Sequence, residues 1–327
     1  MKPSLLIITL FLWLTQIAGA GTTLVKTDYG YDVSIDGKLF ASYTDAYEGT
    51  PILWPLIAPS GHRVTRDFPL NQDSPKSEKR DHPHHRSFWF THGEVKDSDG
   101  KIANFWLIGK DKIVHKKFLM TDSTNDSATI VTENDWVTRA GKTICRDNRT
   151  LQFSSVRTNG GEIRCIDFEV VVTAVDEKVT FLDTKEGTFG IRVAGTLDVD
   201  AKKRNADWGG TIVNSNGETN DAAWGKRANW VNYYGPVEDA ANGKTVAGIA
   251  VMNHPSSFRY PTWWHVRDYG LFAANPFGIH DFENKKELQG NHELKKGESF
   301  KLRYKILIHN GTIEAKTLNK MFDEYKR

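Results

Sequence analysis

The fold is decided by the stretch Ile163-Arg164-Cys165-Ile166-Asp167-Phe168-Glu169-Val170-Val171-Val172. From Ile166 onward, every second residue is aliphatic or aromatic, and Asp167 and Glu169 fall between them. Because successive side chains of a strand point to opposite faces, this alternation places an apolar row on one face and the acids on the other. The pattern predicts an antiparallel β-strand with one buried face.

Similar alternation recurs along the chain, with turn residues between the segments. Strands are predicted at residues 128–137, 143–153, 179–182, 189–193, 246–252 and 300–307. Turns are predicted at Asp36-Gly37, Asn159-Gly160-Gly161, Asn216-Gly217 and Asn242-Gly243. A clear helical spacing of apolar residues is confined to Leu318, Met321, Phe322 and Tyr325. We therefore predict an all-β fold, a large antiparallel β-sandwich with a C-terminal helix.

The N-terminus has the features of a secretory signal peptide. Lys2 precedes the apolar run 5–14, and Ala18-Gly19-Ala20 matches the small-residue cleavage pattern. Residues 1–20 are therefore expected to be removed, and residues 21–327 to form one domain in the periplasm or outside the cell. No later run approaches the ~20 apolar residues of a membrane span.

The net charge bears on the possible binding partners, and the cysteine content bears on disulfide formation. The formal net charge is +2, and lysines and arginines are spread along the chain, which argues against nucleic-acid binding. The two cysteines are Cys145 and Cys165. If Gly160-Gly161 is a hairpin turn, Cys165 faces about residue 154, so direct cross-strand pairing with Cys145 is disfavoured. A disulfide and two separate thiols both remain open.

The segment from Asp81 to Gly93 holds four of the eleven histidines: His82, His84, His85 and His92. Imidazole titrates near neutrality and is costly to bury without a partner, so this density indicates proton transfer or metal binding. The aromatic residues 88–90 suggest that a buried edge holds the histidines in place. The alternative is a set of structural hydrogen bonds.

A second polar region lies between Trp208 and Trp264, which contains five of the ten tryptophans. Trp224, Trp230 and Trp264 are candidates to stack on sugar rings, although tryptophans also cap the ends of sandwiches. His265 and Arg267 are expected on one strand face, as a proton donor beside a cation, or as a surface ion pair.

Carboxylates offer a further set of candidates. Asp167 and Glu169 share a strand face about 6.6 Å apart, near the separations used in glycoside hydrolysis. Alternating acids are also usual on a solvated face. Glu186 and Arg192 are polar groups at predicted strand ends beside glycines.

Several motifs together resemble a known family. They are Pro59-Ser60-Gly61, Thr65-Arg66-Asp67-Phe68-Pro69, the segment 81–93, Asp183-Thr184-Lys185-Glu186-Gly187, Trp224-Gly225-Lys226, Trp264-His265-Val266-Arg267 and Asn275-Pro276-Phe277. The sequence is similar to the exported bacterial family labelled "methane oxygenase PmoA", a domain of unknown function. The resemblance implies a large β-sandwich of the galactose mutarotase type. It also implies an origin in bacteria that degrade polysaccharides. The family's motif residues correspond to Asp81, His82, His84, His85, Arg86, His92, Glu186, Arg192, His265, Arg267 and Asn275.

The leading hypothesis is an exported enzyme that uses acid–base chemistry on a sugar or oligosaccharide, as a hydrolase, lyase or epimerase. The candidate catalytic residues are His84, His85, His92, His265, Asp167, Glu169 and Glu186. The candidate substrate-binding residues are Asp81, Arg86, Arg192, Trp224, Trp230, Trp264, Arg267 and Asn275. The segment 81–92 is expected within about 15 Å of His265, so that the two clusters form one site. No cofactor is predicted.

Two alternatives stay open. The first is a non-catalytic glycan-binding protein, in which the histidines brace loops. The second is a divalent metal site formed by His82, His84 and His92, with His85 or Asp81 as a further ligand.

Overall fold

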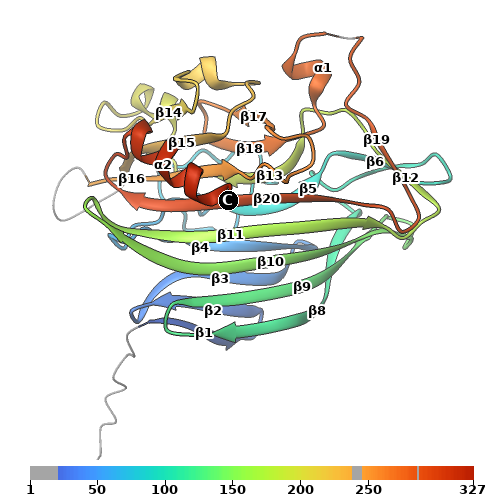
Figure 1. Cartoon of the computed structure of the whole chain (residues 1–327), viewed down its shortest axis with the longest axis horizontal. Coiled ribbons are helices and arrows are strands. Elements are labelled where there is room, and N and C mark those ends of the chain that lie inside the picture. Colours follow the sequence, from blue (N-terminus) through green and yellow to red (C-terminus); the bar gives the residue numbers. More distant parts are fainter. Residues whose placement is uncertain (1–20, 238–244, 286) are drawn as a thin grey trace, which may run out of the picture.

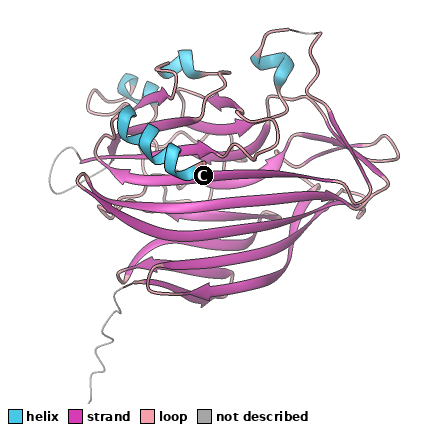
Figure 2. Cartoon of the chain, viewed as in Figure 1, coloured by secondary structure: helices cyan, strands magenta, loops and turns pink. Residues whose placement is uncertain are grey.

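The protein is described by a computed structural model that places residues 21–237, 245–285 and 287–327. Strands dominate it, and their pairings are antiparallel (Figure 2). Two eight-stranded sheets pack against each other around one hydrophobic core. The predicted antiparallel sandwich with a C-terminal helix is therefore confirmed. Residues 1–20 and the predicted turn Asn242-Gly243 lie outside the described residues.

The first sheet takes strands from both halves of the chain. In spatial order they are β1 (Thr22–Thr27), β2 (Gly30–Ile35), β3 (Lys38–Tyr47), β4 (Thr50–Leu56), β5 (Phe88–His92), β13 (Gly187–Arg192), β18 (Leu271–Asn275) and β17 (Trp263–Val266). Asp36 and Gly37, both with positive φ, form the predicted turn between β2 and β3.

The second sheet contains the long strands in the front of Figure 1. In spatial order they are β14 (Thr211–Asn214), β15 (Trp230–Val237), β16 (Thr245–Asn253), β20 (Ser299–Asn310), β11 (Gly161–Ala174), β10 (Thr143–Thr158), β9 (Ser127–Val137) and β8 (Lys112–Ser123). A smaller sheet contains β19 (His292–Lys295), β12 (Lys178–Phe181), β6 (Glu94–Lys96) and β7 (Ile102–Asn104).

Helices are few. They are the α-helices α1 (Ile279–Phe282) and α2 (Ala315–Tyr325) and the 3-10 helices η1 (Val199–Lys203) and η2 (Asn220–Ala223). Leu318 and Phe322 of α2 pack on the second sheet, and Figure 1 shows α2 lying over β16 and β20. Among the described helices, none has the length and apolar character needed to cross a membrane.

Strand β11 follows the predicted alternation. Ile166, Phe168, Val170 and Val172 are buried in the core between the sheets. Cys165 pairs with Ser154 across the β10–β11 hairpin, the register expected from the Gly160-Gly161 turn. Cys145 instead faces Ala174, and both cysteines are buried free thiols. The open question of a disulfide is thus answered by two separate thiols.

The first sheet has two distinct faces, and the difference positions the candidate site. Phe88 and Phe90 point into the core between the sheets, whereas Trp89 belongs to a separate cluster on the other side, here called the outer face. The register aligns Trp89, Gly190, Ala273 and His265 on neighbouring strands, so they share the outer face. The Trp89 indole covers Gly190, where a Cβ would lie only 2.5 Å from the ring.

Candidate active site

The segment Asp81–His85 lies over the outer face and is held by one buried arginine. Arg66, 1% exposed, donates through Nη1 to the carbonyl oxygens of Lys79 (3.0 Å) and Asp81 (2.9 Å) and through Nη2 to those of His82 (2.8 Å) and His85 (3.1 Å). Four main-chain contacts to one rigid guanidinium fix the path of this segment.

The Asp81 carboxylate connects two arginines to a histidine. Its Oδ1 accepts from Arg66 (2.8 Å) and Arg192 (2.9 Å), and its Oδ2 lies 3.1 Å from Nδ1 of His82. Burial alone would raise the pKa of Asp81, but the guanidinium groups of Arg192 and Arg66 outweigh it and lower that pKa. An ionised Asp81 favours a proton on Nδ1 of His82, which leaves the lone pair on Nε2.

His82 also has an unusual backbone. Its φ is +43°, in the left-handed region that non-glycine residues rarely adopt, which costs on the order of 1 kcal/mol. The bond from Arg66 to the His82 carbonyl holds this conformation. The side chain is 43% exposed, so the ring is both fixed and accessible.

The other two histidines of the segment are neutral. Arg192 Nη1 lies 3.1 Å from Nδ1 of His85, and because arginine only donates, Nδ1 must accept and Nε2 carry the hydrogen. Burial, with the charge of Arg192 next, places the pKa of His85 well below its usual value. Burial and the neighbouring charge of His82 lower the pKa of His84 to about 4.

Four aromatic rings form a stack above the sheet. The His82 ring is parallel to Tyr269 (5.2 Å between centroids) and to His85 (4.8 Å), and His85 stacks in turn on Trp89 (5.4 Å). Arg267 lies over the Tyr269 ring at 5.6 Å and over Trp224 at 5.8 Å. The stack gives His82 a fixed orientation next to a cation.

Three predicted site residues hold one connection, residues 182–186 between β12 and β13. His92 Nε2 donates to the carbonyl of Leu182 (3.0 Å), and Asn275 Nδ2 donates to that of Thr184 (2.7 Å). His265 Nδ1 donates to the carbonyl of Lys185 (2.9 Å). All three donors are buried, and they fix the connection immediately before Glu186.

Glu186 lies at the end of this clamped connection. Its carbonyl accepts from the Gly93 N–H at 2.8 Å, and its side chain is 35% exposed. Burial raises the pKa of Glu186, against the charges of Lys185, His82 and Arg267, while Asp281 adds to the increase. Glu186 is therefore within electrostatic reach of both His82 and Arg267.

The structure does not bring His92 together with the other histidines of the segment. His92 is two residues after Phe90 on β5, so its side chain points to the same face as Phe88 and Phe90, away from the outer face. There it contacts Phe181 and Phe277. Burial lowers its pKa to about 4. Because His92 lies on the opposite side of the sheet from the His82 stack, the predicted metal site of His82, His84 and His92 does not form.

His265 shares the outer face with Trp89 but is separated from it by β13 and β18. Three strand spacings of ~4.8 Å place the two backbones about 14 Å apart, so His265 does not contact Trp89. Burial lowers the pKa of His265 to about 4. Its ring holds Lys185 and borders Trp224 at 6.3 Å.

Asp167 and Glu169 do not belong to this site. They lie on the outward side of β11 in the second sheet, where Asp167 pairs with Lys305 (2.9 Å) and Glu169 with Arg303 (3.2 Å). Both sheets separate them from His82. The alternative of a solvated, ion-paired face is the one observed.

Two tryptophans and one arginine predicted to bind substrate are buried in the structure. Trp264 is in the core and donates to the carbonyl of Ala228 (2.9 Å). Trp230 packs under α2 and donates to Asn319 (2.8 Å). Arg86 is 1% exposed and donates to the Tyr47 carbonyl. Trp224, partly exposed beside Arg267, is the predicted tryptophan that lies at the site.

Residue-by-residue reasoning missed Arg66 and Tyr269. Arg66 lies in the motif Thr65-Arg66-Asp67 and Tyr269 follows Arg267 by two residues, but neither the type nor the spacing indicated a role. Their partners are distant in the chain, so a signal for them would have to come from pairs of positions that contact only after folding.

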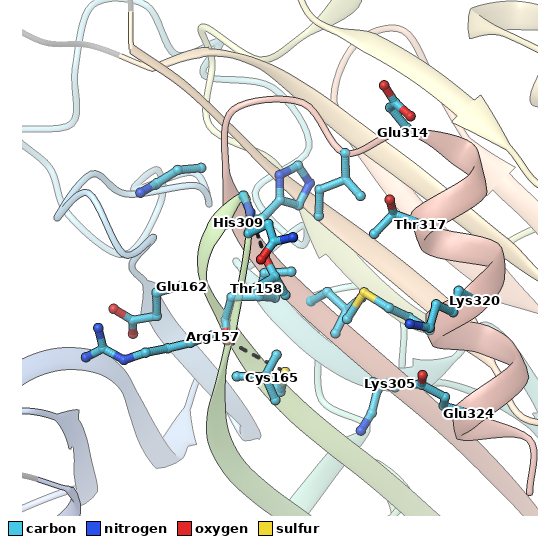
Figure 3. Close-up of a pocket in the computed structure, with 18 of the residues that line it drawn as sticks. Arg157, Thr158, Glu162, Cys165, Lys305, His309, Glu314, Thr317, Lys320 and Glu324 are labelled. Atoms are coloured by element: carbon cyan, nitrogen blue, oxygen red, sulfur yellow. Dashed lines mark hydrogen bonds between the residues drawn. The ribbon is translucent and has the colours of Figure 1, made fainter.

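An open hollow of about 950 Å³ lies elsewhere, between α2 and the β10–β11 hairpin. Figure 3 shows its lining, with Glu314 and Thr317 from the helix side and Arg157 and Glu162 from the hairpin side. It lacks the combination of fixed histidine, buried arginines and half-buried glutamate described above, so we place the candidate site on the outer face.

Together, the fold and the site define an antiparallel β-sandwich protein with a candidate acid–base site over one sheet. The chain belongs to a family of unknown function, DUF6807, whose model matches residues 30–323. The expectation of a domain of unknown function over most of the chain is thereby confirmed, and the family's description carries no methane oxygenase label. A comparison with curated proteins finds no match.

Three similar solved structures show the range of the comparison. A galactose mutarotase-like protein from Clostridium acetobutylicum has a TM-score of 0.36 at 11% identity, over 89% of this chain and 99% of that one. Galactose 1-epimerase from Lactobacillus acidophilus NCFM has a TM-score of 0.36 at 10% identity, over 90% of this chain and 100% of that one. A polysaccharide lyase has a TM-score of 0.34 at 10% identity, over 90% of this chain and 33% of that one. Likenesses this distant carry no conclusion about what the chain binds.

Proposed function

We propose that the protein is an exported enzyme that acts on a sugar or oligosaccharide by acid–base chemistry, with His82 as the base and Glu186 as the acid. The observation that carries the proposal is the arrangement of His82. Its Nδ1 lies against an Asp81 carboxylate that two buried arginines hold, and its accessible ring lies within electrostatic reach of Glu186.

The chemistry follows from the two protonation states. Neutral His82, with its hydrogen on Nδ1, accepts a proton at Nε2 from the substrate. Burial raises the pKa of Glu186, so at a given pH a larger fraction of this carboxyl is protonated and can donate to a leaving oxygen. One proton taken and one given balance the step, and hydrolases, lyases and epimerases share such a pair.

A sugar fits the surroundings better than an apolar substrate does. Trp224 offers a partly exposed indole beside Arg267, an arrangement suited to a ring with apolar C–H groups and polar substituents. Lys185 and Arg267 place two cations near Glu186, so we expect an acidic sugar such as a uronate. Residues 1–20, expected as a signal peptide, would deliver the enzyme to extracellular glycans.

The test is a screen of the purified chain against neutral and uronate-containing oligosaccharides, with products read by mass spectrometry and binding read by calorimetry. We expect turnover of a uronate-containing substrate. Binding of glycans without any product would instead support a non-catalytic glycan-binding protein and overturn the proposal.

A further inference from the structure

Asp183, His280 and Asp281 form a compact group beside the connection that carries Glu186. One ligand-type atom from each side chain lies within 4.8 Å of the others, and no other such group of three was found among the described residues. Asp183 belongs to the 182–186 connection, whereas His280 and Asp281 belong to α1. The group therefore joins two segments far apart in the sequence.

The Asp183 carboxylate is the buried member, with 7% of the side chain exposed. Its Oδ2 accepts from the N–H groups of His280 (3.1 Å) and Gly290 (2.5 Å). Its Oδ1 has no hydrogen-bond partner among the described residues. A buried carboxylate oxygen left in this way is costly unless a cation or a donor satisfies it.

The neighbour of that oxygen is His280 Nδ1, at 2.7 Å but outside hydrogen-bond geometry. Two ligand atoms each ~2.1 Å from one ion and at right angles are about 3.0 Å apart, so a small outward shift of the His280 ring would let both atoms contact one ion. Asp281 Oδ2 lies 3.5 Å from the other ring nitrogen of His280.

The positive charge near the group is already engaged. Arg259 is electrostatically linked to Asp183, but its guanidinium donates to the carbonyl oxygens of Pro276 (3.1 Å), Gly290 (2.5 Å) and Asn291 (3.1 Å). Arg259 therefore does not neutralise the two carboxylates, and their close neighbour is the His280 ring. One imidazole with two carboxylates suits Zn²⁺ or Mn²⁺ better than Ca²⁺ or Mg²⁺, which prefer all-oxygen sites.

We propose that Asp183, His280 and Asp281 bind a divalent transition metal ion, which ties α1 to the connection before Glu186. This site is separate from the histidines of the segment 81–93, and its existence does not depend on the proposed enzymatic activity.

The test is calorimetric titration of the chelator-treated full chain with ZnCl₂ and, separately, MnCl₂. We expect one equivalent of at least one of these ions to bind. His280→Gln and Asp281→Asn should weaken that binding by about tenfold or more. Both side chains are more than a third exposed, so the variants should fold, which circular dichroism checks.

Two controls make the result specific. His62→Gln removes a partly exposed histidine elsewhere, and His82→Gln removes the accessible histidine of the candidate active site; both should bind the ion as the wild type does. The proposal is overturned if the wild type binds neither ion stoichiometrically, if His280→Gln and Asp281→Asn bind with unchanged affinity, or if the loss follows His82→Gln instead.

Discussion

His265 donates from Nδ1 to the carbonyl oxygen of Lys185 at 2.9 Å, and so holds the residue that precedes Glu186. The histidine is 3% exposed, and burial lowers its pKa to about 4. A histidine that the sequence marks as an acid or base is therefore, in the folded chain, a neutral positioning residue. The same holds for His92, which donates to Leu182.

Replacing His265 should separate positioning from packing. His265→Ala removes the donor to Lys185 and leaves a cavity, so we expect the free energy of unfolding to fall by about 2–4 kcal/mol. His265→Gln keeps an N–H donor and should recover part of this loss. Urea denaturation measures both. Equal losses in the two variants would show that the bond to Lys185 contributes nothing.

The two buried histidines also make stability depend on pH. Burial lowers the pKa values of His92 and His265 to about 4 in the folded chain, against 6.5 as the ordinary value. Between these values the unfolded chain binds more protons, so the free energy of unfolding should fall as pH decreases from 6.5 towards 4.

The contribution of each histidine is at most about 3 kcal/mol. Urea denaturation at several pH values checks it, with His265→Gln as the matched variant. The variant should lose stability less steeply than the wild type below pH 6.5. Identical slopes would mean that His265 is protonated equally in both states.

Gly93 should control the placement of Glu186. A Cβ at Gly93 would lie 2.7 Å from the Glu186 carbonyl oxygen and 3.3 Å from its Cβ, so Gly93→Ala must displace this residue. We expect turnover to fall by about tenfold or more. Gly109→Ala is the control, because nothing lies within 4 Å of a Cβ there. If both variants keep wild-type turnover, the position of Glu186 does not matter for activity.

The alternation of apolar and polar residues, with turn residues between the segments, was sufficient to predict the sandwich. It worked because β9, β10, β11 and β20 each bury one face in the core, and part of the other face is covered by α2. It even predicted that Cys165 faces residue 154. In β5 the same reasoning could not work, because Phe88–His92 is buried on both sides and gives no polar face. Nothing in that segment says that Trp89 and His92 point in opposite directions.

The carboxylates show a second limit. Asp167 and Glu169 had favourable spacing along one strand, yet their partners Lys305 and Arg303 come from a strand 138 and 134 residues away in the chain. For Glu186, the sequence signal was only the neighbouring glycine at a predicted strand end. Its surroundings depend on His92, Asn275 and His265, which reach the connection 182–186 from three different strands. Such convergence follows from topology, which local spacing does not contain.

The central claim is that His82 and Glu186 act as a pair. The most direct test compares kcat/KM of the Glu186→Gln and Glu169→Gln variants across pH, on the substrate found in the screen. Both variants remove one glutamate charge, but only Glu186 is within electrostatic reach of His82. We predict that wild-type activity falls as pH rises through the raised pKa of Glu186, that Glu186→Gln loses about 100-fold or more together with this dependence, and that Glu169→Gln keeps both. A Glu186→Gln variant with the wild-type rate and pH profile would contradict the account.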